Sequence, residues 1–313
     1  MGVIHRPVMT DEVICHLGIQ ENGVYFDGTV GTGGHARAIL DAGSEAHDRT
    51  RGCLLVGVDR DPMAVREAQS SLEMFGARAR VLHAEYGDIE EVLESEGIDA
   101  VDGILLDLGI GSHQLESDDR GFSMERGGPL DMRYDPTGGV TAHEVVNRYP
   151  QKKLEEIIRE YGEERRAGSV ARAIVTARGR GAIDNAENLA GIVRAAVTGG
   201  GRLKRGRIDP ATRTFQALRI FVNRELERIE EFIPRGAACL KGDGRMAIIS
   251  FHSLEDRIVK FSFRALAGTT PDAGADYRIL TKKPLVPTTR EQRENPRSRS
   301  AKMRLLMRAN NGH

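Results

Sequence analysis

A glycine-rich turn with acidic residues around it is the part of the sequence whose residue types and spacing could do chemistry. It follows the apolar run 24–27 and reads Asp27-Gly-Thr-Val-Gly31-Thr-Gly33-Gly34-His35. Glycines there permit positive backbone angles and let a ligand lie against bare main chain where a helix begins. Gly31-x-Gly33-x-x-Ala36 fits a dinucleotide-binding fingerprint, and Asp59 ends the next apolar run within reach of a ribose. The pattern predicts an adenosine-type cofactor; the alternative is a tight turn that binds nothing.

The charge around this turn selects among cofactors. Asp27 precedes the glycines, and Asp107 ends a later apolar run, so both would make the pocket negative. Acids repel a pyrophosphate and attract an ammonium or sulfonium group. S-adenosylmethionine carries adenosine, an α-amino group and a positive sulfur, and it is therefore the expected cofactor. A nicotinamide dehydrogenase stays open as an alternative that rests on the fingerprint alone. Tyr86 is expected to cover the adenine or to close the core, and His35 to contact the cofactor.

The elements that must position these residues alternate between strand and helix over the first 110 residues. Apolar runs bounded by turns and separated by helical segments indicate parallel βαβ units. Strands are expected at 24–27, 53–59, 79–84, 101–107 and 245–251, with a closing antiparallel pair from 278–286 and 303–308. Helices are expected at 35–42, 62–75, 89–96, 151–161, 165–178, 186–197, 211–233 and 254–266.

The strand–helix alternation stops near residue 112 and resumes near 211, with only helical periodicity between. Thr141-Ala-His-Glu144, Asp184-Asn-Ala-Glu187 and Ser253-Leu-Glu-Asp256 resemble capping boxes that start helices. The predicted fold is α/β: a Rossmann-like doubly wound sheet of the S-adenosylmethionine-dependent methyltransferase type with an inserted α-helical domain. The expected boundaries are 1–113 and 211–313 for the two parts of the methyltransferase domain, and 114–210 for a helical substrate-recognition domain.

Composition and charge exclude several classes of protein. The 313 residues are 40% hydrophobic and 29% charged, with 45 basic and 46 acidic side chains, a normal globular balance. No apolar run is long enough for a membrane span, and the first residues lack the apolar core of a signal peptide. Three scattered cysteines argue against a disulfide framework or a zinc site and suit a reducing cytosol. No metal ligands are predicted, although a magnesium ion between RNA and the acid-rich segment 85–135 stays open.

Basic residues concentrate in one segment. Residues 201–224 hold seven basic side chains and one acid, Asp209. Such a cluster beside a glycine-rich loop fits phosphates, and an ordinary solvated surface is the equally plausible alternative. Arg213 and the group 202–207 are the candidates for phosphate contact.

Seven motifs carry a family resemblance. They are 27–35 (above), Gly103-Ile-Leu-Leu-Asp-Leu-Gly109, Gly128-Pro-Leu-Asp-Met-Arg133, Tyr161-Gly-Glu-Glu-Arg165, Pro210-Ala-Thr-Arg-Thr-Phe-Gln-Ala217, Ser250-Phe-His-Ser-Leu-Glu-Asp-Arg257 and Asn295-Pro-Arg297. In this order they resemble the bacterial 16S rRNA cytosine-N4 methyltransferase family, of the RsmH/MraW type. The resemblance covers almost the whole chain, and the blocks 210–217 and 250–257 are long enough to be specific.

The resemblance implies a cytoplasmic enzyme that uses S-adenosylmethionine to methylate a cytidine in the decoding region of 16S rRNA. The partner would be 16S rRNA within the small ribosomal subunit, with no DNA and no membrane; an oligomer stays open. The cofactor residues carried over are Gly33, Gly34, His35, Asp59, Tyr86, Asp107 and Gln114. Two positions depart from the family: Tyr86 replaces a frequent Phe, and Gly111-Ser-His113 replaces a more usual Ser-Ser-Pro, which leaves the path of that loop open.

The reaction itself asks for a hydrogen-bond acceptor. A cytosine N4 lone pair is delocalised into the ring, so an acceptor for its N–H would help to free it. Asp107, at the end of the fourth strand, is the expected catalytic residue, with a neighbouring carbonyl or a role towards the cofactor alone as alternatives. His252, after the strand that ends at Phe251, is expected to contact the base or its ribose. A non-enzymatic ribosome-binding protein with the same fold is the remaining alternative.

Overall fold

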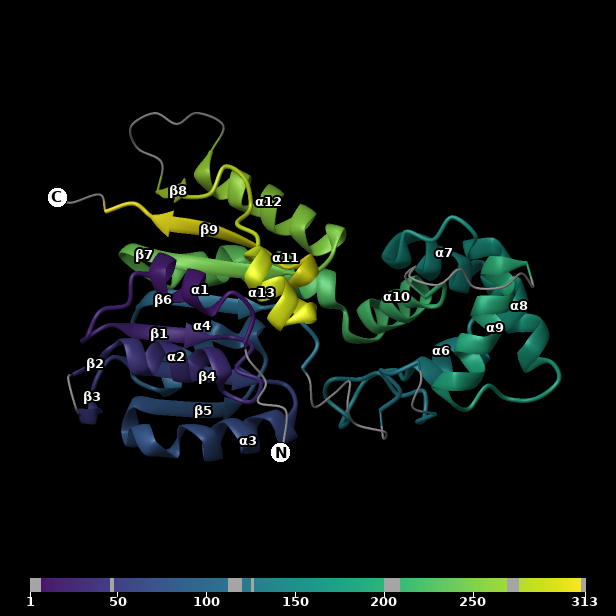
Figure 1. Ribbon diagram of the computed structural model, residues 1–313, viewed down its shortest axis with the longest axis horizontal. Helices are drawn as coiled ribbons and strands as arrows, with labels where there is room; N and C mark the ends of the chain where they lie inside the picture. Colours follow the sequence, from purple (N-terminus) through teal and green to yellow (C-terminus); the bar gives the residue numbers. More distant parts are fainter. Residues whose placement is uncertain are drawn as a thin grey trace. The chain divides into compact units, whose positions relative to one another are not determined.

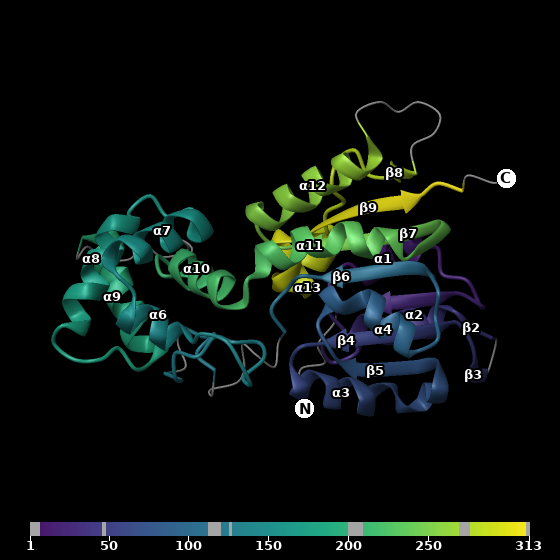
Figure 2. The ribbon, with the colours of Figure 1, turned by 180° about the vertical axis from the view of Figure 1, so that it is seen from behind.

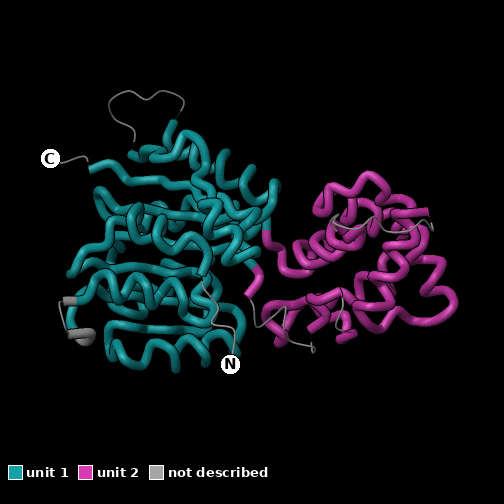
Figure 3. The backbone as a smooth tube through the Cα atoms, viewed as in Figure 1, with its two compact units in different colours: residues 1–109, 226–313 teal, residues 110–225 magenta. Residues whose placement is uncertain are grey.

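The central sheet of the protein is formed by strands that come from both ends of the chain. The computed structural model describes residues 7–45, 48–111, 120–124, 127–199, 209–268 and 276–310. Among these, the chain divides into two compact units, residues 1–109 with 226–313 and residues 110–225, which Figure 3 colours separately.

The first unit contains a mixed sheet of seven strands in the order β5-β4-β1-β6-β7-β9-β8 (Figure 1). The strands are β1 Val24–Asp27, β4 Leu54–Asp59, β5 Ala79–His83, β6 Val101–Asp107, β7 Leu240–Ser250, β8 Tyr277–Ile279 and β9 Lys302–Arg308. The first five of these along the chain are parallel neighbours in the doubly wound order, third-second-first-fourth-fifth. β9 runs antiparallel between β7 and β8. The predicted α/β class, its five parallel strands and its closing antiparallel pair are confirmed.

Helices cover both faces of this sheet, as the two opposite views in Figures 1 and 2 show. The helices of this unit are α1 Thr10–Leu17, α2 Gly34–Ala42, α3 Pro62–Leu72, α4 Ile89–Ser95, α11 Glu225–Ala238 (whose first residue belongs to the second unit), α12 Ser253–Ala267 and α13 Thr289–Glu294, with short 3-10 turns at Glu73–Arg78, Tyr86–Asp88 and Pro296–Ser300. Successive residues of a strand point to opposite faces. Tyr25 therefore packs with α1 and α2, while Phe26 packs with α4 and α11. Three elements were not foreseen: α1, α13 and a hairpin of β2 Ser44–Glu45 and β3 Asp48–Gly52.

The parallel order places the polar ends of the strands at one edge. β1 lies between β4 and β6, so the strand order reverses at the β1–β6 pair, where Asp27 is in register with Leu105. In open α/β sheets, ligands bind at the carboxyl ends of the strands beside such a reversal. Asp27, Asp59 and Asp107 all end their strands at this edge.

The second unit is helical and has a core of its own. It contains α6 Ala142–Arg148, α7 Gln151–Gly162, α8 Ala167–Arg178, α9 Ala186–Thr198 and α10 Thr212–Asn223. α6 starts with the predicted capping box of Thr141 and Glu144. α9 starts at Ala186 as expected, but its N-cap is Asn185 and not the Asp184 of the expected capping box, because the Asn185 side chain accepts the N–H of Asn188. The apolar side chains of these helices form one buried cluster, which includes Leu154, Ile174 and Val193.

The expected domain boundary near 210 differs from the structure, in which the helical unit continues to Glu225. α10 was expected to open the second part of the sheet domain. Its apolar residues Phe215 and Leu218 instead belong to the helical core, and the helix packs on α7. Periodicity alone shows that a helix has an apolar face, and it does not show which core that face joins.

The single helix expected over 211–233 is wrong. The chain forms α10 and α11 with a break at Arg224, whose φ is 51°. Asn223 stabilises the break, because its amide donates to the Met132 carbonyl at 2.7 Å and accepts the Tyr134 N–H at 2.8 Å. The guanidinium of Arg219 also donates two hydrogen bonds to the Glu225 carboxylate, at 2.8 and 2.9 Å. These contacts end α10 against the segment before α6.

Candidate cofactor site

Asp27 is a buried carboxylate at the end of β1. Its side chain is 1% exposed. One oxygen, Oδ1, accepts the N–H of Thr29 at 3.1 Å, and within the described chain the other, Oδ2, has no hydrogen-bond partner. Burial raises the pKa of Asp27 to about 7, with smaller contributions in the same direction from Asp107 and Asp59, while His35 and the Thr29 N–H oppose the rise. The chain thus holds an acid poised between its charged and neutral forms beside the glycine turn.

Asp107 and His35 meet next to Asp27. The two side chains come from the end of β6 and the first turn of α2, and the His35 Nε2 lies 3.5 Å from Asp107 Oδ2. The Asp107 N–H donates to the Thr29 Oγ1 at 2.7 Å, so Thr29 joins both acids. The sequence reasoning missed Thr29; its place two residues after a buried strand-end acid is the signal that could have found it.

The glycine turn approaches its neighbours so closely that side chains would not fit. A Cβ on Gly28 would lie 2.4 Å from Leu106 Cδ2, and one on Gly33 would lie 2.6 Å from Ser71 Oγ. Gly33 also has a φ of 88°, which disfavours any other residue. Gly34 begins α2. The turn therefore leaves bare main chain at the sheet edge.

Asp59 fixes this turn from the neighbouring strand. Its Oδ2 accepts the Gly31 N–H at 2.9 Å and its Oδ1 accepts the Asp61 N–H at 2.9 Å. A carboxylate oxygen can accept more than one hydrogen bond. The predicted contact with a ribose therefore stays a prediction, beside an observed role in shaping the loop.

Tyr86 lies below the turn in the core. It is 7% exposed, and its ring meets Phe232 edge-on with 5.2 Å between ring centroids. This packing corresponds to the core-closing alternative; contact with an adenine is untested. The preceding residue, Glu85, is half-buried and pairs with Arg60 at 2.7 Å and with Arg228. Its pKa is raised by burial in spite of both arginines.

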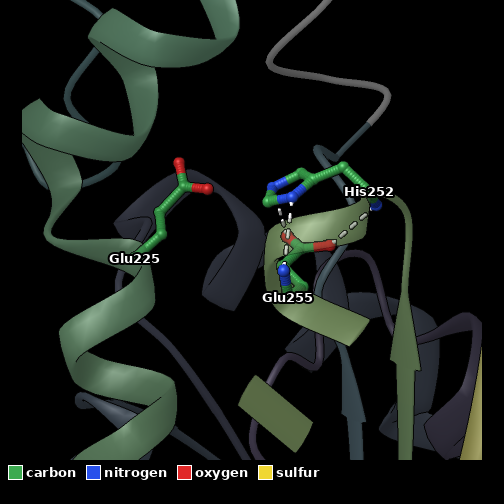
Figure 4. A group of neighbouring side chains, drawn as sticks. All are labelled: Glu225, His252 and Glu255. Carbon is green, nitrogen blue, oxygen red and sulfur yellow. Dashed lines mark hydrogen bonds and ion pairs between the residues drawn. The ribbon is translucent and has the colours of Figure 1, made fainter. Parts of the chain in front are cut away.

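His252 follows β7 and caps α12, which corrects the box expected at Ser253 and Asp256. The His252 side chain accepts the Glu255 N–H at 3.4 Å, and Glu255 Oε2 accepts the His252 N–H (Figure 4). The same Oε2 also accepts the Phe251 N–H. The Nε2 of His252 is 3.1 Å from Glu255 Oε1. The motif was correct and its register was one residue off, because histidine is seldom considered as an N-cap. β7 is the parallel neighbour of β6, so His252 follows the same sheet edge as Asp107.

The remaining predicted residues belong to other parts of the chain. Arg213 lies on α10 in the second unit, 55% exposed, where its Nη1 donates to the Glu163 carbonyl at 3.3 Å. Gln114 and the basic group 202–207 lie outside the described residues. Glu225, also drawn in Figure 4, is a residue of the second unit and pairs there with Arg219.

The polar groups at this edge of the sheet suit S-adenosylmethionine better than a dinucleotide. Both ring nitrogens of His35, Oδ2 of Asp27 and Oδ1 of Asp107 are buried and have no hydrogen-bond partner in the described chain. The site has two carboxyl groups, and no lysine or arginine of the described chain is in contact with them. Such a site attracts a positive charge and repels a pyrophosphate. The glycine turn supplies the bare backbone that an adenosine needs.

The comparison of sequences decides the family. Residues 2–309 match the family described as the MraW methylase family. The chain belongs to this family. This MraW-family methylase is 45% identical over 316 residues to the "Ribosomal RNA small subunit methyltransferase H" of Pelobacter propionicus, with 97% of this chain and 98% of the relative covered. It is also 45% identical, over 314 residues, to the protein of the same name from Syntrophus aciditrophicus, with 96% of each chain covered.

Family membership confirms several expectations. The MraW-family methylase is a methyltransferase, and S-adenosylmethionine is its methyl donor, as the charge of the turn predicted. The nicotinamide dehydrogenase and the non-enzymatic ribosome-binding protein are left without support. No helix in the described ranges combines the length and the apolar character needed to cross a bilayer.

Proposed function

We propose that this protein methylates the exocyclic N4 of a cytidine in the decoding region of 16S rRNA. The observation that carries the proposal is the group of Asp27, His35 and Asp107 beside the glycine turn, in a chain whose relatives are named as small-subunit ribosomal RNA methyltransferases. The N4 atom and the decoding region rest on the motifs from 103–109 to 295–297. The small ribosomal subunit, in the cytoplasm, is the proposed setting.

The residues of the site have distinct roles in this proposal. Gly33 and Gly34 let the cofactor lie on the backbone, and His35, Asp59, Asp107 and Gln114 hold its polar groups. Tyr86 supports the floor beneath the adenine. When bound, the cofactor supplies a positively charged, transferable methyl group. Asp107, together with Asp27 in its charged form, favours that positive charge.

The nucleophile needs alignment and the removal of a proton. Holding the amine and the methyl about 3–3.5 Å apart supplies much of the rate enhancement. Asp107 accepts a hydrogen bond from the N4 amine and so directs its lone pair away from the ring. His252, at the same edge, contacts the base or its ribose.

The helical unit, residues 110–225, is proposed to recognise the RNA. Arg213 is exposed on α10, and it is a candidate for phosphate contact together with the group 202–207. The target cytidine has to leave its base stack to reach the methyl, which favours an unpaired or weakly paired base.

The test is mass spectrometry of digested 16S rRNA. A strain that lacks the gene is complemented with the wild-type protein, with Asp107→Asn or with Asp102→Asn, which changes a paired acid at the other end of β6. N4-methylcytidine is expected with the wild type and Asp102→Asn, and is expected to be strongly reduced with Asp107→Asn. Identical methylcytidine content with and without the wild-type protein would refute the function.

A separate binding test addresses the cofactor. Thermal stability of the purified protein is measured with S-adenosylhomocysteine and with NAD. A rise in melting temperature with the first and none with the second is expected, because the two acids oppose a pyrophosphate. Equal stabilisation by NAD would contradict the proposal that the two acids make the site unfavourable for a pyrophosphate.

A further inference from the structure

Four buried polar atoms that have no hydrogen-bond partner among the described residues belong to the ends of β1 and β6 and the start of α2. They are Asp27 Oδ2, both ring nitrogens of His35, and Asp107 Oδ1. Asp27 and His35 are 1% and 6% exposed. Buried polar atoms are almost always hydrogen-bonded, so a group that is not requires an explanation. A bound cofactor can reach Asp107, whose side chain is 20% exposed. Asp27 is fully buried, so contact with a cofactor does not explain its unpaired oxygen.

Two of the three side chains, Asp107 and His35, are in contact, and Thr29 ties Asp27 to the same group. Asp107 is the most exposed of them, and its Oδ2 lies 3.5 Å from the Nε2 of His35. His35 in turn acts electrostatically on Asp27. Thr29 keeps the two acids in place, because its N–H donates to Asp27 and its hydroxyl accepts the Asp107 N–H. The group extends from the partly exposed Asp107 at the end of β6 to the buried Asp27 at the end of β1.

Methylation of an amine requires a place for one proton. In the proposed reaction the bond between sulfur and the methyl carbon breaks and a bond between that carbon and N4 forms. Loss of the methyl group would turn the sulfonium into a neutral thioether. The N4 nitrogen would then carry four bonds and a positive charge, so it has to release one of its N–H protons. The positive charge therefore leaves the sulfur and reappears as a proton that the site must accept.

We propose that Asp107, His35 and Asp27 form a relay that accepts this proton and stores it away from the cofactor. Asp107 takes the proton from N4 and passes it to the Nε2 of His35, and the imidazole shares it with Asp27. The relay gains one positive charge as the sulfur loses one, so the net charge of the enclosed site is unchanged by the reaction. In the proton transfer, Asp27 and His35 act through Asp107, which alone contacts the amine. The relay rests on the proposed function.

The surroundings of Asp27 suit such storage. Its pKa of about 7 means that it can take up and release a proton near neutral pH. The charged and titratable groups that face it are His35 from α2, Asp107 from β6 and Asp59 from β4. Two of them are acids and one is a base, so a proton added to this group relieves repulsion between carboxylates.

The first experiment needs no turnover. Infrared spectra of the protein without cofactor are recorded across neutral pH for the wild type, Asp27→Asn and the matched control Asp102→Asn. The wild type and the control are expected to show a protonated carboxyl band that disappears through neutral pH, and Asp27→Asn is expected to lack it. A band that stays in Asp27→Asn, or a wild type without one, overturns the relay.

The second experiment follows the proton during methyl transfer. Single-turnover rates on small-subunit particles are measured against pH for the same three proteins. In Asp27→Asn the rate is expected to fall about tenfold and to lose the step near neutral pH that the wild type and Asp102→Asn show. A merely structural role for Asp27 would lower the rate without changing the profile, and that result overturns the relay alone. A wild type that methylates no cytidine overturns the proposed function, and the relay with it.

Discussion

Two aspartates on β6 show how differently the two ends of one strand are used. At the first end, Asp102 Oδ2 accepts the Val24 N–H at 2.7 Å and the Lys241 ammonium at 2.7 Å. At the other end, Asp107 Oδ1 is buried and has no hydrogen-bond partner among the described residues, and its Oδ2 lies 3.5 Å from the His35 Nε2. Asp102, which joins neighbouring strands, has hydrogen-bond partners from the protein. Asp107, at the candidate site, has an oxygen without one in the described chain. A buried polar group without a hydrogen-bond partner destabilises the folded protein. Its presence therefore indicates a residue whose role is in binding or catalysis and not in folding.

Half-buried acids elsewhere in the first unit support the same distinction. Glu85 is about as exposed as Asp107, but it has Arg60 and Arg228 as partners. Asp256 pairs with Arg304 at 2.7 Å, which lowers its pKa. Asp27, in contrast, is set between two further acids and one histidine. A basic partner, lysine for Asp102 and arginine for Glu85 and Asp256, thus distinguishes these acids from Asp27 and Asp107, which we propose serve the reaction.

Exchange of each β6 aspartate for asparagine gives the largest expected difference. Asp107→Asn removes the proton acceptor and a charge beside the cofactor, and should lower kcat by about 10²- to 10⁴-fold. Asp102→Asn should leave kcat within about threefold, because its partners hold strands together far from the chemistry. Single-turnover methylation of small-subunit particles measures both. An equal fall in kcat in both variants would mean that the hydrogen-bond and ion-pair partners of an aspartate do not indicate whether it takes part in the reaction.

Asp27→Asn should change how stability depends on pH. The pKa of Asp27 is raised from 3.8 to about 7 on folding, so the folded state binds its proton more tightly than the unfolded chain does. The wild type therefore loses stability as pH rises from about 4 to about 7, by about 4 kcal/mol at most. Asparagine carries no such charge, so the variant should be more stable than the wild type at pH 8 and similar at pH 4.

Urea unfolding without cofactor, at both pH values, measures this effect. Titration of all other groups is common to the two proteins and cancels in their difference. A difference that does not vary with pH would show that Asp27 is charged throughout.

Gly33→Ala should weaken cofactor binding by about tenfold, since the new Cβ lies 2.6 Å from Ser71 Oγ and the φ of 88° strains any side chain. Gly97→Ala is the matched control, with a φ of 69° and nothing within 4 Å of its Cβ. It carries a similar backbone strain without the clash. Calorimetric titration with S-adenosylhomocysteine should separate them. Similar affinities would show that strain, and not space at the turn, governs the site.

The smallest expected effect is on stability at the structural end of β6. Asp102→Asn keeps the shape of the side chain and removes its charge, so it should cost about 1 kcal/mol of unfolding free energy. Lys241→Met should cost a similar amount, and the double variant little more than either alone. Denaturant unfolding of the three variants measures the coupling. Fully additive losses would show that the 2.7 Å contact contributes nothing.

Local patterns predicted the sheet and the chemistry at its edge. Apolar runs ending in Asp27, Asp59 and Asp107 gave the strands and their polar ends, because burial and turn residues act over a few positions. The sequence could not show that Asp59 accepts the Gly31 N–H, since that contact depends on how two loops meet. Nor could it show the break at Arg224, which is stabilised by Asn223 contacts to a segment about ninety residues earlier. Long-range hydrogen bonds override local helical preference there.

The order of synthesis gives the parallel pairing of β6 with β7 a further consequence. β6 is complete at Asp107, but its neighbour begins at Leu240, after the whole helical unit. While the nascent chain emerges, β1, β4, β5 and β6 can pair with one another, and the apolar edge of β6 stays open until β7 arrives. Open strand edges promote association with other chains, and pairing over such a sequence separation is slow. The helical unit, with its own core, can fold in that interval, so a chain cut short before residue 240 is expected to aggregate through β6 and to retain a folded set of helices.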